Sequence, residues 1–316
     1  MIPDQLMHLP LAAEGLWGRI FVFDGYGELL SLLSQSIVAG AILALIGGFI
    51  GTFVAMRDGA FAVHGIAELS FAGAAFFLLM GFDVITGSLV GSIAAAAIIG
   101  ALGARAKHNG SLIGVLMPFG LGLGILFLSL YQGRSANKFS LLTGQIVSVD
   151  GAQTTEMAVG AVVVIGMLFL VWRPLTFASL DPDVAAAKGV PMRTLSMVFM
   201  LLLGISVALS VQVVGSLLVL ALLITPAAAA VQITASPVKA LILSVIFAEI
   251  STVGGILLAL AGSLPISPYV TTISFVIYLV CRVIGGIRRR TTGSGRRVHD
   301  TDRGRSALSS AELPSR

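Results

Sequence analysis

The sequence has very little charge. Asp, Glu, Lys and Arg make up 11% of its 316 residues, whereas hydrophobic residues make up 57% and the mean hydropathy is +1.01. Soluble domains usually carry about 25% charged residues. The shortage of charge excludes an ordinary soluble domain. It predicts an all-α fold, namely a polytopic bundle of transmembrane helices.

Cysteine and the common catalytic motifs are also scarce. Cys281 is the single cysteine, so no disulfide can form within the chain, and we expect a buried thiol. There is no Gly-x-x-x-x-Gly-Lys-Ser/Thr phosphate loop, no serine elbow and no His-Glu-x-x-His. The sequence therefore predicts that the chain is not an enzyme and does not itself hydrolyse ATP.

Apolar stretches of about 20 residues, each long enough to cross a bilayer as a helix, recur along the chain. The nine candidate spans cover about residues 29–56, 60–80, 84–104, 111–131, 155–172, 193–210, 213–235, 239–261 and 267–287. Only "VQVVG" separates the sixth span from the seventh, and Pro226 interrupts the seventh. Eight spans, one of them broken or re-entrant, remain the alternative.

The basic residues predict the orientation, because short internal loops carry an excess of Lys and Arg. With nine spans and an external N-terminus, the internal connections hold Arg57, Arg105, Lys107, Arg173, Lys188, Arg193 and Lys239. The external side keeps Arg19, Arg134 and Lys138. This divides the chain into an external segment (1–28), a transmembrane domain (29–287) and a basic, disordered internal tail (288–316). No aromatic residues interleave with the charge of the tail, so we expect it to face anionic lipid and not nucleic acid.

His64, Glu68 and Glu249 lie well inside the predicted spans, where a charge costs about 3 kcal/mol or more. Arg282, near the end of the ninth span, can extend to the internal interface. His64 and Glu68 are at positions i and i+4, on one face of a helix. Their nitrogen and oxygen atoms suit a divalent cation such as zinc, manganese or ferrous iron. A hydrogen-bonded pair that joins helices, or a proton relay, is the alternative. Glu249 is a third candidate ligand, or an acceptor for neighbouring helices. His8 and His108 have no acidic or cysteine neighbours and are not expected to bind metal.

The internal loop "WRPLTFASLDPDVAAAKGVPMRT" predicts a short, well-capped helix. Asp181 is suited to be the N-cap, Pro182 to the first turn and Asp183 to the positive end of the helix dipole. Gly189 ends the helix before Pro191. Such an element on the internal face is expected to dock a partner, and a plain amphipathic interfacial helix is the alternative.

Two stretches, "RPLTFASLDPDVAAAKGVP" and "ALSVQVVGSLLVLALLITPAAAA", resemble the permease subunits of ATP-binding-cassette importers for zinc and manganese. The similarity extends over about residues 30 to 285. It implies that the first stretch is the coupling helix that inserts into a separate ATPase subunit, with Asp181, Pro182, Asp183, Ala186 and Gly189 as its residues. It also implies that Gly215 and Pro226 lie near the pathway, at a hinge.

One motif departs from the family pattern. Family members commonly carry Gly-Asp-x-x-x-His-x-x-x-Pro-Gly in the second span. Here His64 stands at the Asp position, Glu68 at the His position, and Ala72-Gly73 replaces Pro-Gly. The exchange keeps a nitrogen and a carboxylate ligand at the same spacing, but it leaves the preferred metal undetermined.

The sequence and the resemblance together predict the permease of a bacterial, ATP-driven importer in the cytoplasmic membrane. The resemblance implies two permease copies, two ATPase subunits and an external metal-binding protein. Zinc or manganese would be the transported ion, and no cofactor would stay bound. The alternatives are a gradient-driven transporter or cation channel that uses the His64 and Glu68 pair, and a scaffold that transports nothing.

Overall fold

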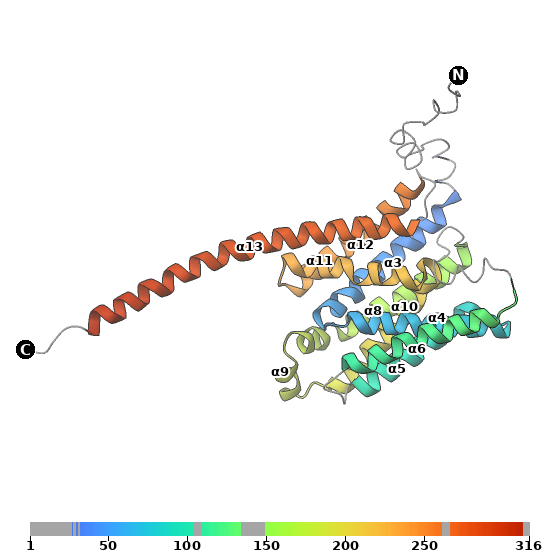
Figure 1. The fold of residues 1–316 in the computed structure, drawn as a ribbon, viewed down its shortest axis with the longest axis horizontal. Helices are drawn as coiled ribbons and strands as arrows, with labels where there is room; N and C mark the ends of the chain where they lie inside the picture. Colours follow the sequence, from blue (N-terminus) through green and yellow to red (C-terminus); the bar gives the residue numbers. More distant parts are fainter. Residues whose placement is uncertain are drawn as a thin grey trace, which may run out of the picture.

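A computed structural model describes residues 27, 30, 32–103, 109–133, 149–260 and 266–311. These residues confirm the all-α prediction, since they form helices and no strand. The helices are α3 (Ser34–Met56), α4 (Ala60–Met80), α5 (Val84–Gly103), α6 (Asn109–Leu130), α8 (Gly151–Leu180), α9 (Pro182–Ala187), α10 (Met192–Leu223), α11 (Thr225–Ile233), α12 (Pro237–Leu260) and α13 (Ile266–Ala311). Figure 1 shows them packed side by side as a bundle. His8, His108 and nearly all of segment 1–28 lie outside the described residues.

Eight of the described helices are long and apolar enough to cross a membrane. The predicted span 213–235 is not among them. In its place is a shorter apolar stretch, Leu218–Ile233, which is divided between the end of α10 and α11. The described part of the chain therefore has eight full-length spans, and the predicted seventh span is present as a shorter, broken stretch.

The chain reverses direction at Gly215. Near the start of α10, the ring of Phe199 packs edge-on against Phe53 of α3. Leu223 lies 24 positions after Phe199 in α10, and its carbonyl lies against Gly51, which also belongs to α3. A straight helix would separate Phe199 from Leu223 by about 36 Å. Gly215 has non-helical angles (φ 78°, ψ 160°) inside α10, so the return begins there. The short stretch after it runs back along α3.

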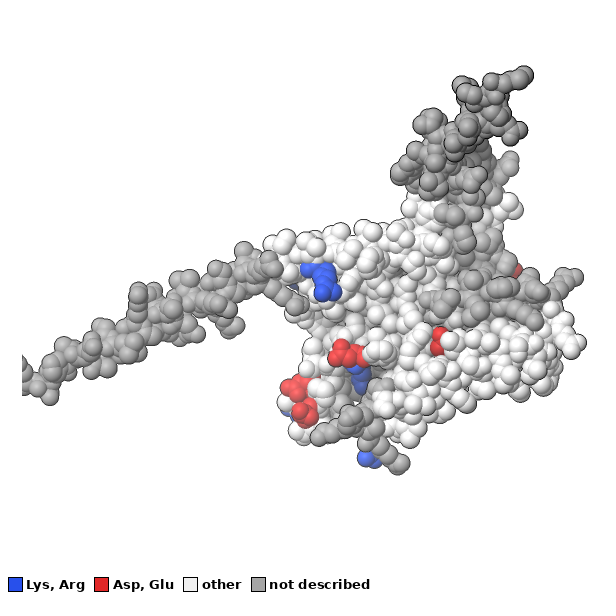
Figure 2. Space-filling model, in the orientation of Figure 1, with Lys and Arg blue, Asp and Glu red and all other residues white. Residues whose placement is uncertain are grey.

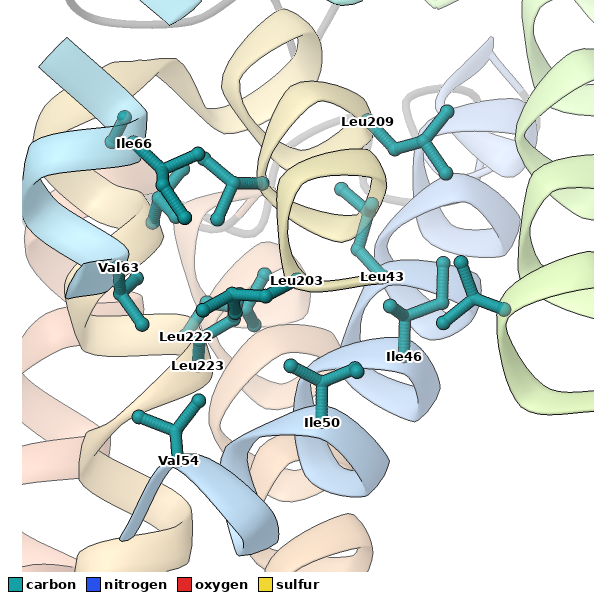
Figure 3. Packing of buried hydrophobic residues seen from close by; sticks show 14 of the residues in the cluster. Leu43, Ile46, Ile50, Val54, Val63, Ile66, Leu203, Leu209, Leu222 and Leu223 are labelled. Carbon is teal, nitrogen blue, oxygen red and sulfur yellow. The ribbon is translucent and has the colours of Figure 1, made fainter. Parts of the chain in front are cut away.

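Glycines bring the helices close together. A side chain at Gly48 of α3 would collide with the backbone of Val245 in α12. A side chain at Gly73 of α4 would collide with the carbonyl of Gly87 in α5. Close approach of this kind is how helices associate in lipid, where no hydrophobic force acts between them. Figure 3 shows the core that results, in which aliphatic side chains of α3, α4 and α10 interlock.

The ends of three helices meet at one end of the bundle, which we call the α9 end. Phe53 of α3 packs edge-on against Trp172 of α8 and Phe199 of α10, and Arg57 stacks over the Phe199 ring at 5.2 Å. Burial lowers the pKa of Arg57. Arg57 is therefore packed into the bundle. Helix α9 connects α8 to α10 at this end and contacts both helices.

One predicted boundary needs correction. Helix α8 runs to Leu180, past the predicted end at residue 172, because Pro174 is accommodated within it. The backbone of α13 is helical to Ala311. No proline occurs between Pro268 and Pro314, so no residue of that kind stops the helix. Figure 1 shows α13 extending far beyond the other helices.

Candidate metal site and coupling helix

His64 and Glu68 lie one turn apart on α4, as the spacing predicts. The His64 Nε2 and Glu68 Oε1 atoms are 3.8 Å apart, which is longer than a hydrogen bond. The two side chains differ in exposure: 27% of the His64 side chain is accessible, against 4% of the Glu68 side chain. The pair therefore combines a partly accessible imidazole with a deeply buried carboxylate.

Each of these side chains has a buried polar atom without a hydrogen-bond partner among the described residues. The atoms are His64 Nδ1 and Glu68 Oε2. Leaving a buried polar atom unpaired costs about 1–3 kcal/mol, more for a charged group. A pair that served to join helices would form these bonds. The geometry instead leaves donor atoms free for a ligand, which argues against the structural alternative.

Glu249 does not join the pair within one chain. It is half-buried on α12, a helix that packs against α3, α11 and α13, whereas α4 packs against α5, α6 and α10. Among the residues that the structure describes, no group of three His, Cys, Asp or Glu side chains could hold a metal ion. The predicted three-residue set of His64, Glu68 and Glu249 is therefore not assembled by this chain alone.

The short, capped helix predicted between Asp181 and Gly189 is present as α9. The Asp181 carboxylate accepts a hydrogen bond from the Val184 amide at 3.1 Å, and Pro182 occupies the first turn of α9. Gly189 has a positive φ of 83°, and the Gly189 amide donates to the Ala186 carbonyl. Asp183 is exposed in the first turn. The cap, the proline and the glycine together define a helix of six residues.

The surface of α9 reveals a residue that the sequence analysis missed. Val184 is 43% exposed and lies one position after Asp183, while Ala185 beside it is fully buried. Val184 therefore presents an apolar side chain to the surface beside the exposed Asp183. Figure 2 shows acidic and basic side chains gathered at the α9 end, whereas most of the bundle surface in that view is uncharged.

The stretch that runs back along α3 after Gly215 is bounded or broken at two places. Gly215 lies at the first break, and Pro226 lies just after the second, between α10 and α11. Gly215 is where α10 reverses, and its angles are accessible almost only to glycine. Pro226 is buried in the first turn of α11, so it begins a helix there and does not kink one. The predicted hinge residues thus coincide with the observed breaks in the backbone.

The pattern of the ABC 3 transport family matches residues 30–285 of the chain. The chain belongs to this family. The resemblance seen in the sequence is thereby confirmed. The permease prediction agrees with this membership, because the family is one of ABC transporters.

Named relatives of this ABC 3 family protein are membrane subunits of metal transport systems. A manganese transport system membrane protein, MntC of Halalkalibacterium halodurans, is 30% identical over 241 residues, covering 75% of this chain and 81% of its own length. The high-affinity zinc uptake system membrane protein ZnuB of Haemophilus influenzae is 22% identical, covering 80% and 97%.

A solved structure shares the fold of this family member. PsaBC from Streptococcus pneumoniae, determined in complex with a Fab, superposes with a TM-score of 0.73 at 22% sequence identity. The match covers 82% of this chain and 95% of the other. At that identity, the likeness supports the helix arrangement described above.

Proposed function

We propose that this protein is the permease subunit of an ATP-driven importer of zinc or manganese. The observation that carries the proposal is the His64 and Glu68 pair of α4, whose free donor atoms are buried in the bundle of an ABC 3 family chain. Zinc accepts imidazole and carboxylate ligands, and manganese accepts both as well. The names of MntC and ZnuB point to the same two ions.

A second copy of the chain would complete the ion site. One chain supplies two ligands, and zinc sites usually have four. Two copies related by a twofold axis would bring together two imidazoles and two carboxylates. The His64 side chain is partly accessible in the single chain, which is compatible with such an arrangement. A site shared between two chains would also have to bind its ion weakly enough to release it.

The α9 end is the face that would contact the ATPase subunits. Asp181, Asp183 and Val184 are exposed there on a rigid, capped helix. In this proposal the α9 end faces the cytoplasm and the N-terminus lies outside. An external metal-binding protein would deliver the ion at the opposite end, and the membrane would be the bacterial cytoplasmic membrane. The chain itself would perform no chemistry and hold no permanent cofactor.

The ion site is tested by alanine substitutions in the assembled transporter. His64→Ala and Glu68→Ala should each abolish uptake of radioactive zinc or manganese into proteoliposomes that contain the ATPase partner and ATP. Each change removes one of the two ligands that a chain contributes. The control is Glu156→Ala, which removes an exposed carboxylate near the start of α8 and should leave uptake unchanged. Normal uptake by both α4 variants would refute the site.

A further inference from the structure

Helix α6 lies directly over the part of α4 that carries Glu68, and Gly120 is the point of contact. A Cβ atom at position 120 would lie 3.1 Å from the carbonyl carbon of Glu68 and 3.1 Å from the amide nitrogen of Leu69. Those are backbone atoms, which cannot rotate away as a side-chain end can. Two other glycines of α6, Gly114 and Gly122, have nothing within 4 Å of the corresponding position.

The distance between α6 and α4 depends on this one row of contacts. Helix α6 packs mainly on α4 and touches α5 at few positions. Only 22% of the residues in its apolar stretch are buried within the chain. On either side of Gly120, Gly65 of α4 lies against Ile113, and the ring of Phe71 lies against Gly124. No larger interface in the described chain holds α6 in place if this row is pushed apart.

The backbone at Glu68 lies against α6. Glu68 is 3% exposed, and its Oε2 atom lacks a partner in the described structure. We infer that Gly120 is a positioning residue for the ion site: it lets α6 cover Glu68 and so keeps the carboxylate dry and fixed in orientation. This inference rests on the function proposed above, and it adds a specific residue that acts through Glu68.

A small displacement is sufficient to disturb such a site. A methyl group at position 120 must push α6 away by a few tenths of an ångström. Ion sites lose function when their ligands shift by about 0.5 Å. The displaced helix would also admit water to the carboxylate, which would then solvate it in competition with the metal. Changes to residues that orient metal ligands typically cost about 10–100-fold in affinity.

The test compares Gly120→Ala with Gly122→Ala in the complete transporter. Both place a methyl group on the same helix two positions apart, but only the first meets α4. Gly120→Ala should raise the KM for zinc or manganese by about tenfold at equal amounts of protein in the membrane. Gly122→Ala should leave the KM unchanged. An equal KM for both variants would overturn the inference.

A second measurement does not depend on transport. In a Cys281→Ala background, Glu68→Cys can be labelled with a small water-soluble thiol reagent. Adding Gly120→Ala should speed the labelling several-fold, and adding Gly122→Ala should not. Equal labelling rates would overturn the inference even if Glu68→Ala abolishes uptake. If Glu68→Ala instead transports normally, the proposed function fails, whatever the labelling shows.

Discussion

At the scale of single residues, the glycines of this protein serve different purposes. Gly120 and Gly48 permit close contact between helices, whereas Gly215 permits a backbone conformation. The combination of φ 78° and ψ 160° is accessible almost only to glycine, and another residue there costs about 1–3 kcal/mol. The reversal of α10 therefore depends on one residue.

Gly215→Ala should lower the melting temperature of the purified protein, because alanine would be strained at that position. The measurement is thermal unfolding in detergent. Gly166→Ala is the matched control, since Gly166 lies in α8 with open space around it and should tolerate a methyl group. Equal melting temperatures for the two variants would contradict the role assigned to Gly215.

At the scale of elements, α9 is a six-residue helix that owes its form to its ends. A helix this short is not stable by itself. The bond from the Val184 amide to the Asp181 carboxylate is worth about 1 kcal/mol. The anchoring of α9 on Ala185, and the packing of α8 and α10 beneath it, supply the rest.

Asp181→Ala should therefore loosen α9 and reduce the amount of metal taken up per ATP hydrolysed. Asp181→Asn should retain most of the coupling, because asparagine also caps helices. Uptake and ATP hydrolysis are measured in the same proteoliposomes. If the alanine variant takes up as much metal per ATP as the asparagine variant, the Asp181 cap does not contribute to coupling.

At the scale of the whole molecule, the proposed transporter needs more than one chain. Within the described ranges no group of three His, Cys, Asp or Glu side chains could hold a metal ion, and the sequence contains no phosphate loop. Membership of the ABC 3 transport family favours an ATP-driven importer over a gradient-driven transporter or channel. The complete unit would be an assembly of two permeases with two ATPases.

The chain alone, in liposomes with an imposed proton or sodium gradient, should accumulate no zinc or manganese. Adding the ATPase partner and ATP should restore accumulation. Filter-binding assays with radioactive metal measure both conditions. Gradient-driven accumulation by the chain alone would support the gradient-driven alternative and contradict the importer.

The sequence by itself determined the features that depend on local composition and spacing. Apolar runs defined the spans, because a helix must be long enough to cross a bilayer. The four-residue interval placed His64 and Glu68 on one face, and the Asp181 to Gly189 pattern predicted α9 with both of its caps. These features depend only on residues that are close together in the sequence, so they can be predicted without knowing how the helices pack.

Only the tertiary structure decided what depends on distant segments. It showed that the chain turns back at Gly215, because contacts to α3 fix where Phe199 and Leu223 lie. It separated Glu249 from the α4 pair, and it placed Gly120 against Glu68, 52 positions away in the sequence. Periodicity within a helix cannot reveal which neighbour covers it, since that is settled by how all the helices pack together.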